Sequence, residues 1–307
     1  MSAQNTRILA YNAEAIAEAA RLIAAGQPVA VPTETVYGLA ADATSGEAVA
    51  RIYEAKGRPA FNPLIVHVRD VAQASEFASL DERALALAER YWPGPLTLVV
   101  PLREGAAIAS LATAGLATVA VRAPAHPAMR DLLEAAGGPL AAPSANASGR
   151  ISPTRASHVL ASLGGRIPLI VDAGPTVHGL ESTIVAATGG PLRLLRPGPI
   201  DLGLALDTDA GVESPGRLES HYAPSKPLRL DAPRAEPDEW LIGFGDVAGD
   251  ASLSAAGDLV EAAASLFDKL HEAERQVHAR IAVAPIPKSG LGAAINDRLR
   301  RAAEPRG

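Results

Sequence analysis

The chain has 307 residues, enough for two domains and a sizeable hydrophobic core. Apolar residues make up 48% of it and charged residues 20%, a balance typical of a soluble globular protein rather than a disordered one. The absence of cysteine excludes disulfides, iron–sulfur clusters, thiolate zinc sites and a cysteine nucleophile. The formal net charge of −6 argues against a protein whose main task is gripping nucleic acid, because such proteins usually carry a basic surplus.

No segment has the pattern of a secretory signal or a membrane span. The N-terminal residues lack an apolar signal core. The longest run without a charged residue, 105–121, is rich in Ala, Gly, Ser and Thr and falls short of the ~20 strongly apolar residues that a span needs. We therefore expect a cytoplasmic protein, and the lack of cysteine is compatible with that reducing compartment.

Helix-like and strand-like segments alternate up to about residue 205. Asn12 is a typical N-cap for a helix over 13–25 that Gly26 closes. Further helices are expected at 46–55, 81–90, 127–136 and 154–162. Strands are expected at 28–32, 64–68, 96–100, 118–121, 140–142, 169–172, 183–186 and 192–195. This alternation predicts an α/β fold with a mixed, partly parallel sheet flanked by helices.

The character of the sequence changes near residue 201. From there to about 237, Pro, Gly, Ser and charged residues dominate and periodicity fades, which indicates a linker. A second, smaller α/β unit is expected after it, with strands at 240–244 and 281–284 and helices at 259–274 and 291–303. We therefore divide the chain into a large domain (1–205), a linker (206–237) and a small domain (238–307).

A hydroxyl-rich turn follows the strand at 28–32. It runs Pro32-Thr33-Glu34-Thr35-Val36-Tyr37-Gly38-Leu39 and would present side-chain and backbone donors at a sheet edge, where α/β proteins bind ligands. An ordinary capping turn explains the same residues equally well.

A basic segment, Lys56-Gly57-Arg58-Pro59, follows the helix at 46–55. Lys56 and Arg58, two apart in an extended segment, would project to the same side, and Gly57 would let the backbone approach a ligand. Such a pair suits phosphate oxygens. The competing interpretation is a solvated basic turn, since helix C-termini favour cations. His67, between two valines on the next strand, is more often a satisfied core residue than a ligand-binding one.

A polar loop, Ala142-Pro143-Ser144-Ala145-Asn146-Ala147-Ser148-Gly149, leaves a strand and is followed by Ser152-Pro153-Thr154. Its N–H and O–H groups could bind a phosphate or a nucleobase, and an ordinary cap and turn is the alternative. Arg122, Ser182 and Arg196 lie at expected strand ends and are candidates for the same groove, because α/β sites gather there.

Other common motifs of catalytic and nucleotide-binding sites are absent from the sequence. The chain has no GxxxxGK[ST] phosphate loop, no HExxH and no GxSxG. The glycines at 243, 245 and 249 miss the GxGxxG spacing of a dinucleotide-binding turn.

In combination, PTETVYGL, KGRPAFNPLIVHV, PSANASGRISPT and ESTIV resemble the YrdC-like domain of the L-threonylcarbamoyladenylate synthases, over roughly residues 10–205. His221-Tyr222-Ala223-Pro224 and the C-terminal unit resemble the long, two-domain form of that family, with a small domain shorter than usual. The resemblance implies a YrdC-like twisted mixed sheet with flanking helices, followed by a smaller Rossmann-like α/β domain. It also implies that the linker folds over the groove as a lid.

The resemblance further implies a reaction. L-threonine, bicarbonate or CO2 and ATP would give L-threonylcarbamoyl-AMP and pyrophosphate, the first step of the t6A modification at position 37 of tRNA. Threonine contacts are implied for Thr35, His67, Arg122, Ser182 and the backbone of Ala142. Nucleotide contacts are implied for Arg58, Asn62, Thr118, Ser144, Asn146, Ser152, Arg196 and Tyr222. Catalysis is expected to rest on Lys56 and Arg58 together with Mg2+ carried by ATP, without protein side chains as metal ligands.

Two alternatives differ in class. One is an RNA-binding module, because YrdC-like domains have a concave basic face; the acidic composition and the 4% of aromatic residues oppose it. The other is a carbamoyltransferase of metal-centre maturation, which would carry zinc-finger and acylphosphatase-like domains that this chain lacks. The expected partners are the three substrates and a downstream t6A transferase complex, with any tRNA binding secondary.

Overall fold

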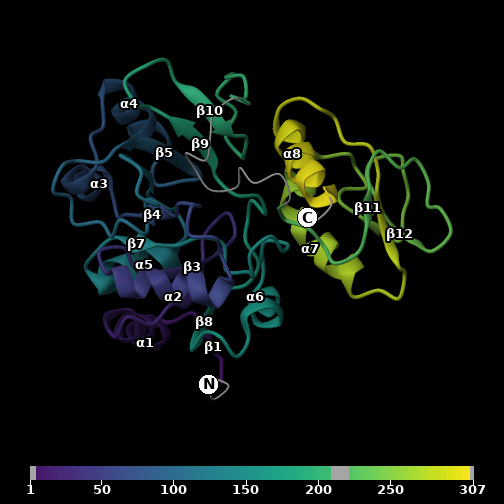
Figure 1. Ribbon diagram of the computed structural model, residues 1–307. Helices are drawn as coiled ribbons and strands as arrows, with labels where there is room; N and C mark the ends of the chain where they lie inside the picture. The colour runs from purple at the N-terminus through teal and green to yellow at the C-terminus, as the bar shows by residue number, and fades with distance from the viewer. Residues whose placement is uncertain (1–4, 209–220, 305–307) are drawn as a thin grey trace.

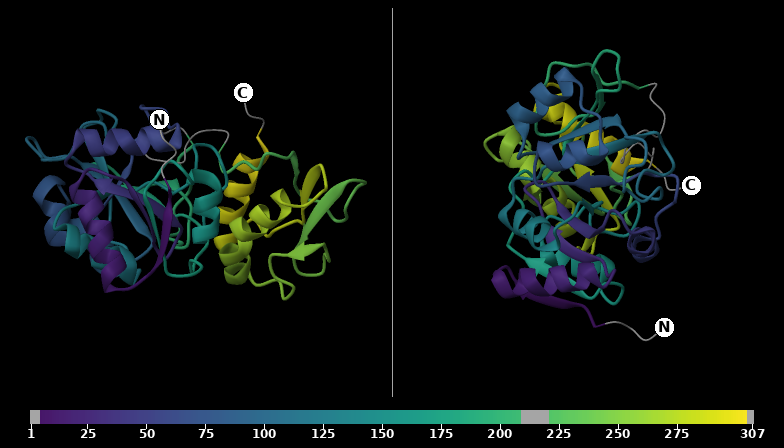
Figure 2. Two further views of the ribbon diagram at one scale, coloured as in Figure 1. Left: turned by 90° about the horizontal axis from the view of Figure 1, so that it is seen from below. Right: turned by 90° about the vertical axis from the view of Figure 1, so that its left-hand side faces the viewer.

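The computed structural model describes residues 5–208 and 221–304. Within these ranges the chain forms a ten-stranded sheet and a four-stranded sheet. The two sheets belong to two bodies that lie side by side, and helices α7 (Leu259–Glu274) and α8 (Leu291–Ala303) of the smaller body face the larger one (Figures 1 and 2). No helix of the described ranges is both long and apolar enough to cross a membrane.

The larger sheet is mixed. Its strands are β1 (Arg7–Ala10), β2 (Val29–Pro32), β3 (Tyr37–Asp42), β4 (Ile65–His67), β5 (Leu96–Pro101), β6 (Thr118–Arg122), β7 (Leu140–Ala141), β8 (Leu169–Asp172), β9 (Thr183–Ala186) and β10 (Arg193–Arg196). Their order is β1-β8-β2-β3-β7-β4-β6-β5-β9-β10. The pairs β1–β8, β2–β8, β4–β6 and β5–β9 are parallel and the others antiparallel. The predicted mixed α/β sheet with flanking helices is confirmed.

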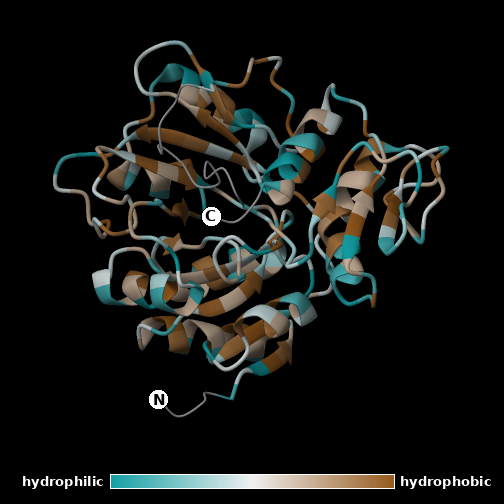
Figure 3. Cartoon of the chain, turned by 45° about the vertical axis from the view of Figure 1, so that its right-hand side comes forward, coloured by the Kyte–Doolittle hydropathy of each residue, from teal (hydrophilic) through white to brown (hydrophobic). Residues whose placement is uncertain are grey.

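Helices cover both faces of this sheet. They are α1 (Ala13–Ala24), α2 (Gly46–Lys56), α3 (Val71–Phe77), α4 (Glu82–Tyr91), α5 (Pro127–Ala136) and α6 (Ala156–Leu163). Val29 and Val31 of β2 pack with α1 and α5, whereas Ala30, pointing the other way, joins the core formed with α2, α3, α4 and α6. This two-sided burial explains why central strands such as β2 and β5 are largely apolar (Figure 3).

The first helix lies where its local sequence signals predicted it, but some strands have no such signals and were not predicted. The side chain of Asn12 accepts a hydrogen bond from the backbone N–H of Ala15 at 2.8 Å, so the predicted N-cap is confirmed. Strands β1 and β3 and helix α3 were not predicted. Residues 37–39, interpreted as the end of a turn, instead begin β3, and Ala142 lies just after β7 rather than within a strand. β3 is buried on both faces and rich in Gly and Ala, so it has neither alternation nor β-branched residues to mark it.

The smaller sheet has the order β11-β14-β12-β13 with parallel pairings. Its strands are β11 (Leu228–Arg229), β12 (Glu239–Gly243), β13 (Ala251–Ser252) and β14 (Arg280–Val283). β11 falls inside the predicted linker, of which residues 209–220 lie outside the described ranges. Both α7 and α8 pack on the face that carries Ile242, Ile281 and Val283. A doubly wound Rossmann fold has helices on both faces, so the Rossmann-like detail stays a prediction.

The two bodies share a continuous apolar contact. Val36, Ile151 and Leu180 of the large domain belong to the same buried cluster as the inner faces of α7 and α8. Gly179 has a left-handed backbone (φ +65°), and a Cβ there would lie 2.4 Å from the carbonyl oxygen of Ala263 in α7. Only glycine permits this close approach, so the large domain is shaped to receive the small one.

Candidate functional site

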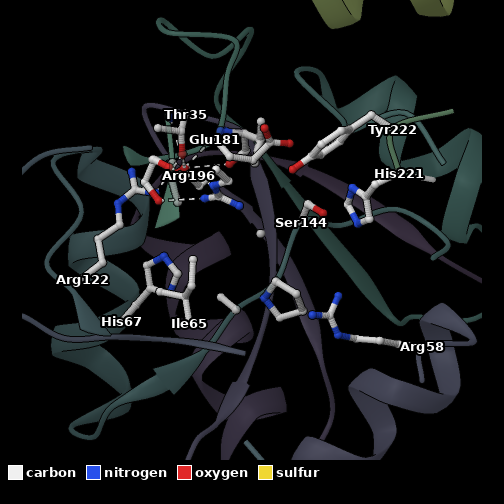
Figure 4. A pocket seen from close by; sticks show the side chains of 16 residues that line it. Thr35, Arg58, Ile65, His67, Arg122, Ser144, Glu181, Arg196, His221 and Tyr222 are labelled. Atoms are coloured by element: carbon white, nitrogen blue, oxygen red, sulfur yellow. Dashed lines mark hydrogen bonds between the residues drawn. The ribbon is translucent and has the colours of Figure 1, made fainter. Parts of the chain in front are cut away.

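A cavity lies where the strand ends of the large sheet meet the chain segment that leads into the small domain (Figure 4). Its empty volume is about 540 Å3, including the part open to solvent. The lining residues are Thr33, Thr35, Val36, Gly38, Arg58, Ile65, His67, Arg122, Ala142, Pro143, Ser144, Glu181, Ser182, Arg196, His221 and Tyr222. The cavity therefore gathers residues that are up to about 190 positions apart in the sequence.

Most residues implied by the sequence motifs meet in this cavity. Those that line it are Thr35, Arg58, His67, Arg122, Ala142, Ser144, Ser182, Arg196 and Tyr222. Those that do not line it are Lys56, Asn62, Thr118, Asn146 and Ser152. Most of the first set comes from strand ends and adjoining loops, as the general rule for α/β sites predicts, while Arg58 follows helix α2 and Tyr222 lies in the segment that leads into the small domain.

Arg122 organises one end of the cavity. It ends β6 beside His67 of β4, because these two residues are partners in the parallel register. Its guanidinium donates to Glu34 Oε1 at 2.5 Å, Thr35 Oγ1 at 2.9 Å and the carbonyl of Gly94 at 3.2 Å. These bonds use three of the five guanidinium N–H groups, so a further anion can be bound. Burial opposes ionisation of Glu34, but Arg122 outweighs it and lowers the pKa of that carboxyl.

His67 is a neutral imidazole at ordinary pH. Burial, and then the nearby charge of Arg122, lowers its pKa to about 3. Its side chain is buried, and Nδ1 has no hydrogen-bond partner among the described residues. A buried polar atom without a partner at the wall of a cavity is suited to a ligand that supplies the missing bond.

Lys56 supports the polar loop from behind. The structure contradicts the extended segment expected here: Lys56 is the last residue of α2, and Gly57 ends the helix with a left-handed backbone (φ +59°). Gly57 serves as the helix C-cap, and the close approach of its backbone to a ligand stays a prediction. The ammonium of Lys56 donates to the carbonyl oxygens of Ser144 and Asn146. Burial, and then the charge of Arg58, lowers the pKa of this amine well below its usual value.

Arg58 lines the cavity from the loop that follows α2. Its guanidinium donates to the carbonyls of Asn62 at 3.1 Å and Pro63 at 2.9 Å, which fixes its direction. Burial lowers its pKa to about 10, so it stays a cation at neutral pH. The side-chain amide of Asn62 is buried beside it without a partner among the described residues. This segment is therefore not the solvated basic turn that was the alternative.

Ser182 and Arg196 form a third group at the start of β9 and the end of β10. The Oγ of Ser182 lies 2.7 Å from Thr97 Oγ1 and accepts from Arg196 at 3.0 Å, while the backbone carbonyl of Ser182 accepts a second bond from the same arginine. Arg196 is buried. Thr118, another predicted nucleotide contact, lies at the start of β6 and is half-buried. The Ser182 hydroxyl is thus oriented by a cation and a hydroxyl group, and no histidine of the described ranges hydrogen-bonds to it.

A buried network joins the cavity wall to the small domain. Glu181 accepts from Ser152 Oγ at 2.5 Å and from Arg298 of α8 at 2.8 Å. Arg298 is completely buried and also binds Asp297 at 3.0 Å. Its guanidinium carbon lies 5.5 Å from the centre of the Tyr222 ring. The small domain thereby holds the tyrosine against the cavity.

Tyr222 closes the cavity under backbone strain. Its φ is +63°, unusual for a bulky residue, and its ring packs near Phe267 of α7 at 5.6 Å between centroids. The Tyr222 hydroxyl is buried without a partner among the described residues. A strained tyrosine whose hydroxyl lacks a partner is suited to contact a ligand.

Sequence reasoning assigned no role to several cavity residues. Glu34 and Glu181 each directly precede a predicted residue, and His221 directly precedes Tyr222. Adjacent polar residues in the quoted motifs were the available signal, but only the fold shows that the carboxylates pair with Arg122 and Arg298.

The protein side chains do not form a preformed metal site within the described ranges. No group of three His, Asp or Glu is arranged to hold an ion. Glu34 and Glu181 are both engaged by arginines. Mg2+ bound mainly through the phosphate oxygens of a nucleotide fits this donor set, whereas a metal held by a cage of carboxylates does not.

The fold and the cavity define a two-domain α/β protein with three buried arginines (Arg58, Arg122 and Arg196) around one cavity, an arrangement suited to an anionic ligand. Residues 21–198 match the family model described as telomere recombination, and residues 193–304 match the one described as threonylcarbamoyl-AMP synthase, C-terminal domain. The chain belongs to the threonylcarbamoyl-AMP synthase family, in its two-domain form.

Individual relatives agree with this assignment. The threonylcarbamoyl-AMP synthase of Bacillus subtilis is 40% identical, over 96% of this chain and 94% of the relative. That of Pyrococcus abyssi is 41% identical, over 92% of each chain. The crystal structure of P. abyssi Sua5 complexed with L-threonine has a TM-score of 0.88 and 37% identity, with 97% of each chain covered.

Proposed function

We propose that this chain catalyses the formation of L-threonylcarbamoyl-AMP and pyrophosphate from L-threonine, bicarbonate or CO2 and ATP, the first step of t6A37 modification of tRNA. The observation that carries the proposal is the meeting of the four sequence motifs in one cavity with two chemically different ends. Relatives named threonylcarbamoyl-AMP synthase that are alike over more than nine-tenths of the chain support it.

One end of the cavity suits an amino acid. The two N–H groups that Arg122 keeps available would bind the threonine carboxylate. His67, Thr35, Ser182 and the backbone of Ala142 surround that position with neutral donors and acceptors. A related protein, P. abyssi Sua5, has been crystallised with L-threonine, which supports this placement.

The other end suits a nucleotide. Figure 4 shows Arg58, His221 and Tyr222 on the side of the cavity opposite Arg122, with Ser144 toward the same side. In our proposal Arg58 and Arg196 bind phosphate oxygens, Ser144 binds through its hydroxyl, and the hydroxyl of Tyr222 gains the partner that it lacks. In the same proposal, Asn62, Thr118, Asn146 and Ser152 complete the nucleotide site.

Lys56 acts differently from Arg58 in this proposal. It contributes positive charge from behind the loop and fixes the carbonyls of Ser144 and Asn146, so that the loop faces the nucleotide. Arg58 faces the cavity directly and neutralises the triphosphate. Mg2+ would enter with ATP and supply further neutralisation of phosphate charge.

The chemistry needs positioning rather than a protein nucleophile. The threonine amine adds to CO2 and loses a proton to give a carbamate. A carbamate oxygen then forms a bond to the α-phosphorus of ATP as the bond to pyrophosphate breaks. Ser182 is held by Thr97 and Arg196, which supports a binding role for its hydroxyl. Juxtaposed substrates and arginine cations lower the barrier, and the closed position of Tyr222 excludes water from the carbamate and the mixed anhydride.

We also propose what each part of the chain contributes to the reaction and where the product goes. The large domain (1–205) supplies most of the cavity, Tyr222 of the linker (206–237) closes it, and the small domain (238–307) holds this tyrosine. The product would pass to a downstream t6A transferase complex in the cytoplasm, with direct tRNA binding secondary.

Pyrophosphate release tests the proposal. The protein is incubated with ATP, bicarbonate and L-threonine, and release is compared with mixtures that lack threonine or contain L-valine instead. We expect release to depend on threonine, because the carbamate that attacks ATP forms on its amine. Equal release in all three mixtures would contradict the proposed reaction.

A further inference from the structure

A second cavity lies between the two domains, apart from the proposed active site. Its walls come from the chain after the polar loop, from α6 and from the C-terminal end of α7. Its empty volume is about 950 Å3, including the part open to solvent. None of its lining residues lines the first cavity. The proposed reaction assigns it no role.

Three arginines converge on this cavity from separate elements. Arg150 follows the polar loop, Arg166 follows α6, and Arg275 follows α7. Their side chains are exposed, and within the described ranges the one side-chain contact recorded for them is a long bond from Arg166 to the carbonyl of Ala55 at 3.4 Å. The lining contains one carboxylate, Glu274, which binds the backbone N–H of Ser225 at 2.5 Å. The cavity is thus strongly cationic in a protein whose net charge is −6.

The sequence shows the same concentration of charge. Residues 135–171 contain three arginines and no Asp or Glu. Isolated exposed arginines are usually solvated. Here two of the three arginines that line the cavity, Arg150 and Arg166, lie in this stretch without acidic residues. The third, Arg275, reaches the same cavity from the other domain. Guanidinium groups arranged around a concavity match the oxygens of a phosphate group.

Two stacked histidines also line the cavity. His158 of α6 and His271 of α7 stack across the domain boundary with ring centroids 3.9 Å apart. His271 Nε2 lies 3.1 Å from the carbonyl oxygen of Ser152, and its pKa is lowered to about 4, chiefly by burial. The pair adds neutral surface to the lining, so the positive charge of the cavity comes from its arginines.

We propose that this interdomain cavity is a second binding site, for a small phosphate-bearing anion such as pyrophosphate. Both domains supply arginines, so a bound anion bridges them. The site also contacts the proposed active site through the backbone: Asn146 Nδ2 donates to the carbonyl of Arg150 at 2.8 Å, and the N–H of Ala223 donates to the carbonyl of Gly149 at 2.8 Å. A bound anion therefore stabilises the arrangement in which Tyr222, next to Ala223, closes the first cavity.

A small anion fits better than an RNA strand. Single-stranded nucleic acid is usually bound by an extended basic track with aromatic side chains on which bases stack. This cavity is concave and enclosed between two domains, and aromatic residues make up 4% of the chain. The three arginines line one hollow, as a compact ligand requires.

Calorimetric titration with inorganic pyrophosphate at low salt tests the proposal on the full chain. The informative variant is Arg150→Gln/Arg275→Gln, and the matched control is Arg69→Gln/Arg130→Gln, which removes two exposed arginines that do not line the cavity. We expect the first variant to bind pyrophosphate at this site at least tenfold more weakly and the control to bind like the unaltered chain. All four side chains are exposed, so folding should be retained.

Three further measurements separate the outcomes. Titrations on an Arg58→Ala background weaken binding at the first cavity, where Arg196 remains; if that change alone abolishes all pyrophosphate binding, the second site does not exist. Binding of a single-stranded RNA 12-mer that depends on Arg150 and Arg275, without pyrophosphate binding there, would also overturn the proposal. Hydrogen exchange of the unaltered chain supplies a readout without variants: pyrophosphate should slow exchange at 147–151 and 271–275, and no change in either segment would contradict the site.

Discussion

Arg298 is predicted to be the main polar link between the two domains. It is fully buried, and its partners Glu181 and Asp297 have side-chain exposures of 8% and 5%. Replacing it by methionine keeps much of its volume but leaves the buried carboxylate of Glu181 without its cation, whereas Asp297 keeps Arg300 and Arg301. Removing one member of a buried ion pair typically costs about 3–5 kcal/mol of folding free energy. We expect a loss in that range for Arg298→Met.

The matched control is Arg300→Met. This residue lies on the same helix and binds the same Asp297 at 3.0 Å, but its side chain is 59% exposed. Exposed ion pairs contribute about 0–1 kcal/mol, so this change should have little effect. Urea unfolding followed by circular dichroism and tryptophan fluorescence gives the comparison, provided that the two transitions coincide.

A second substitution tests the cause. Glu181→Gln combined with Arg298→Met removes the buried charge pair, so the double variant should be more stable than the sum of the two single losses predicts. Because Arg298 lies over the Tyr222 ring, Arg298→Met should also raise KM for ATP more than it lowers kcat. A loss below about 1 kcal/mol, or strictly additive losses, would refute this explanation.

Three further predictions concern the first cavity. Arg58→Ala should cost at least ~2 kcal/mol of transition-state stabilisation, or about thirtyfold in kcat/KM for ATP, whereas Arg69→Ala, an exposed change, should leave kcat/KM unaltered. Tyr222→Phe should raise KM for ATP without lowering stability, because it deletes a buried hydroxyl that has no partner in the described protein; an unchanged KM would contradict the nucleotide contact. For His67, whose pKa burial lowers to about 3 from about 6.5 in the unfolded chain, the stabilising contribution is complete above pH 6.5 and is lost as pH falls. His67→Asn should therefore reduce the slope of unfolding free energy against pH between 6 and 4 by up to about 1.4 kcal/mol per pH unit, and an unchanged slope would show that His67 titrates normally.

The sequence predicted the elements whose signals are local. Asn12 and Gly26 bound the first helix because capping and left-handed turns depend on single residue types. β3 was missed because a strand buried on both faces has no alternation, and its Gly and Ala residues resemble a turn. The linker interpretation failed at β11, where two residues become a strand only by pairing with β14, more than 50 positions later.

In the candidate site, too, the local features were predictable and the long-range contacts were not. The residue types of the motifs indicated anion binding, and the family resemblance indicated which residues meet. The direction of Lys56 was not predictable, since it depends on the polar loop lying against the end of α2. The pairing of Glu181 with Arg298 joins positions 117 residues apart and depends on how the domains dock. Such long-range contacts have no local pattern in a single sequence.

The central claim is that one cavity joins threonine, a carbamoyl carbon and AMP. Mass spectrometry of the product formed from L-threonine, ATP and 13C-bicarbonate tests it most directly. The proposed reaction predicts an adenylate that contains threonine and is one mass unit heavier with labelled than with unlabelled bicarbonate. A threonine adenylate without the label, or no adenylate while ATP is consumed, would contradict the claim.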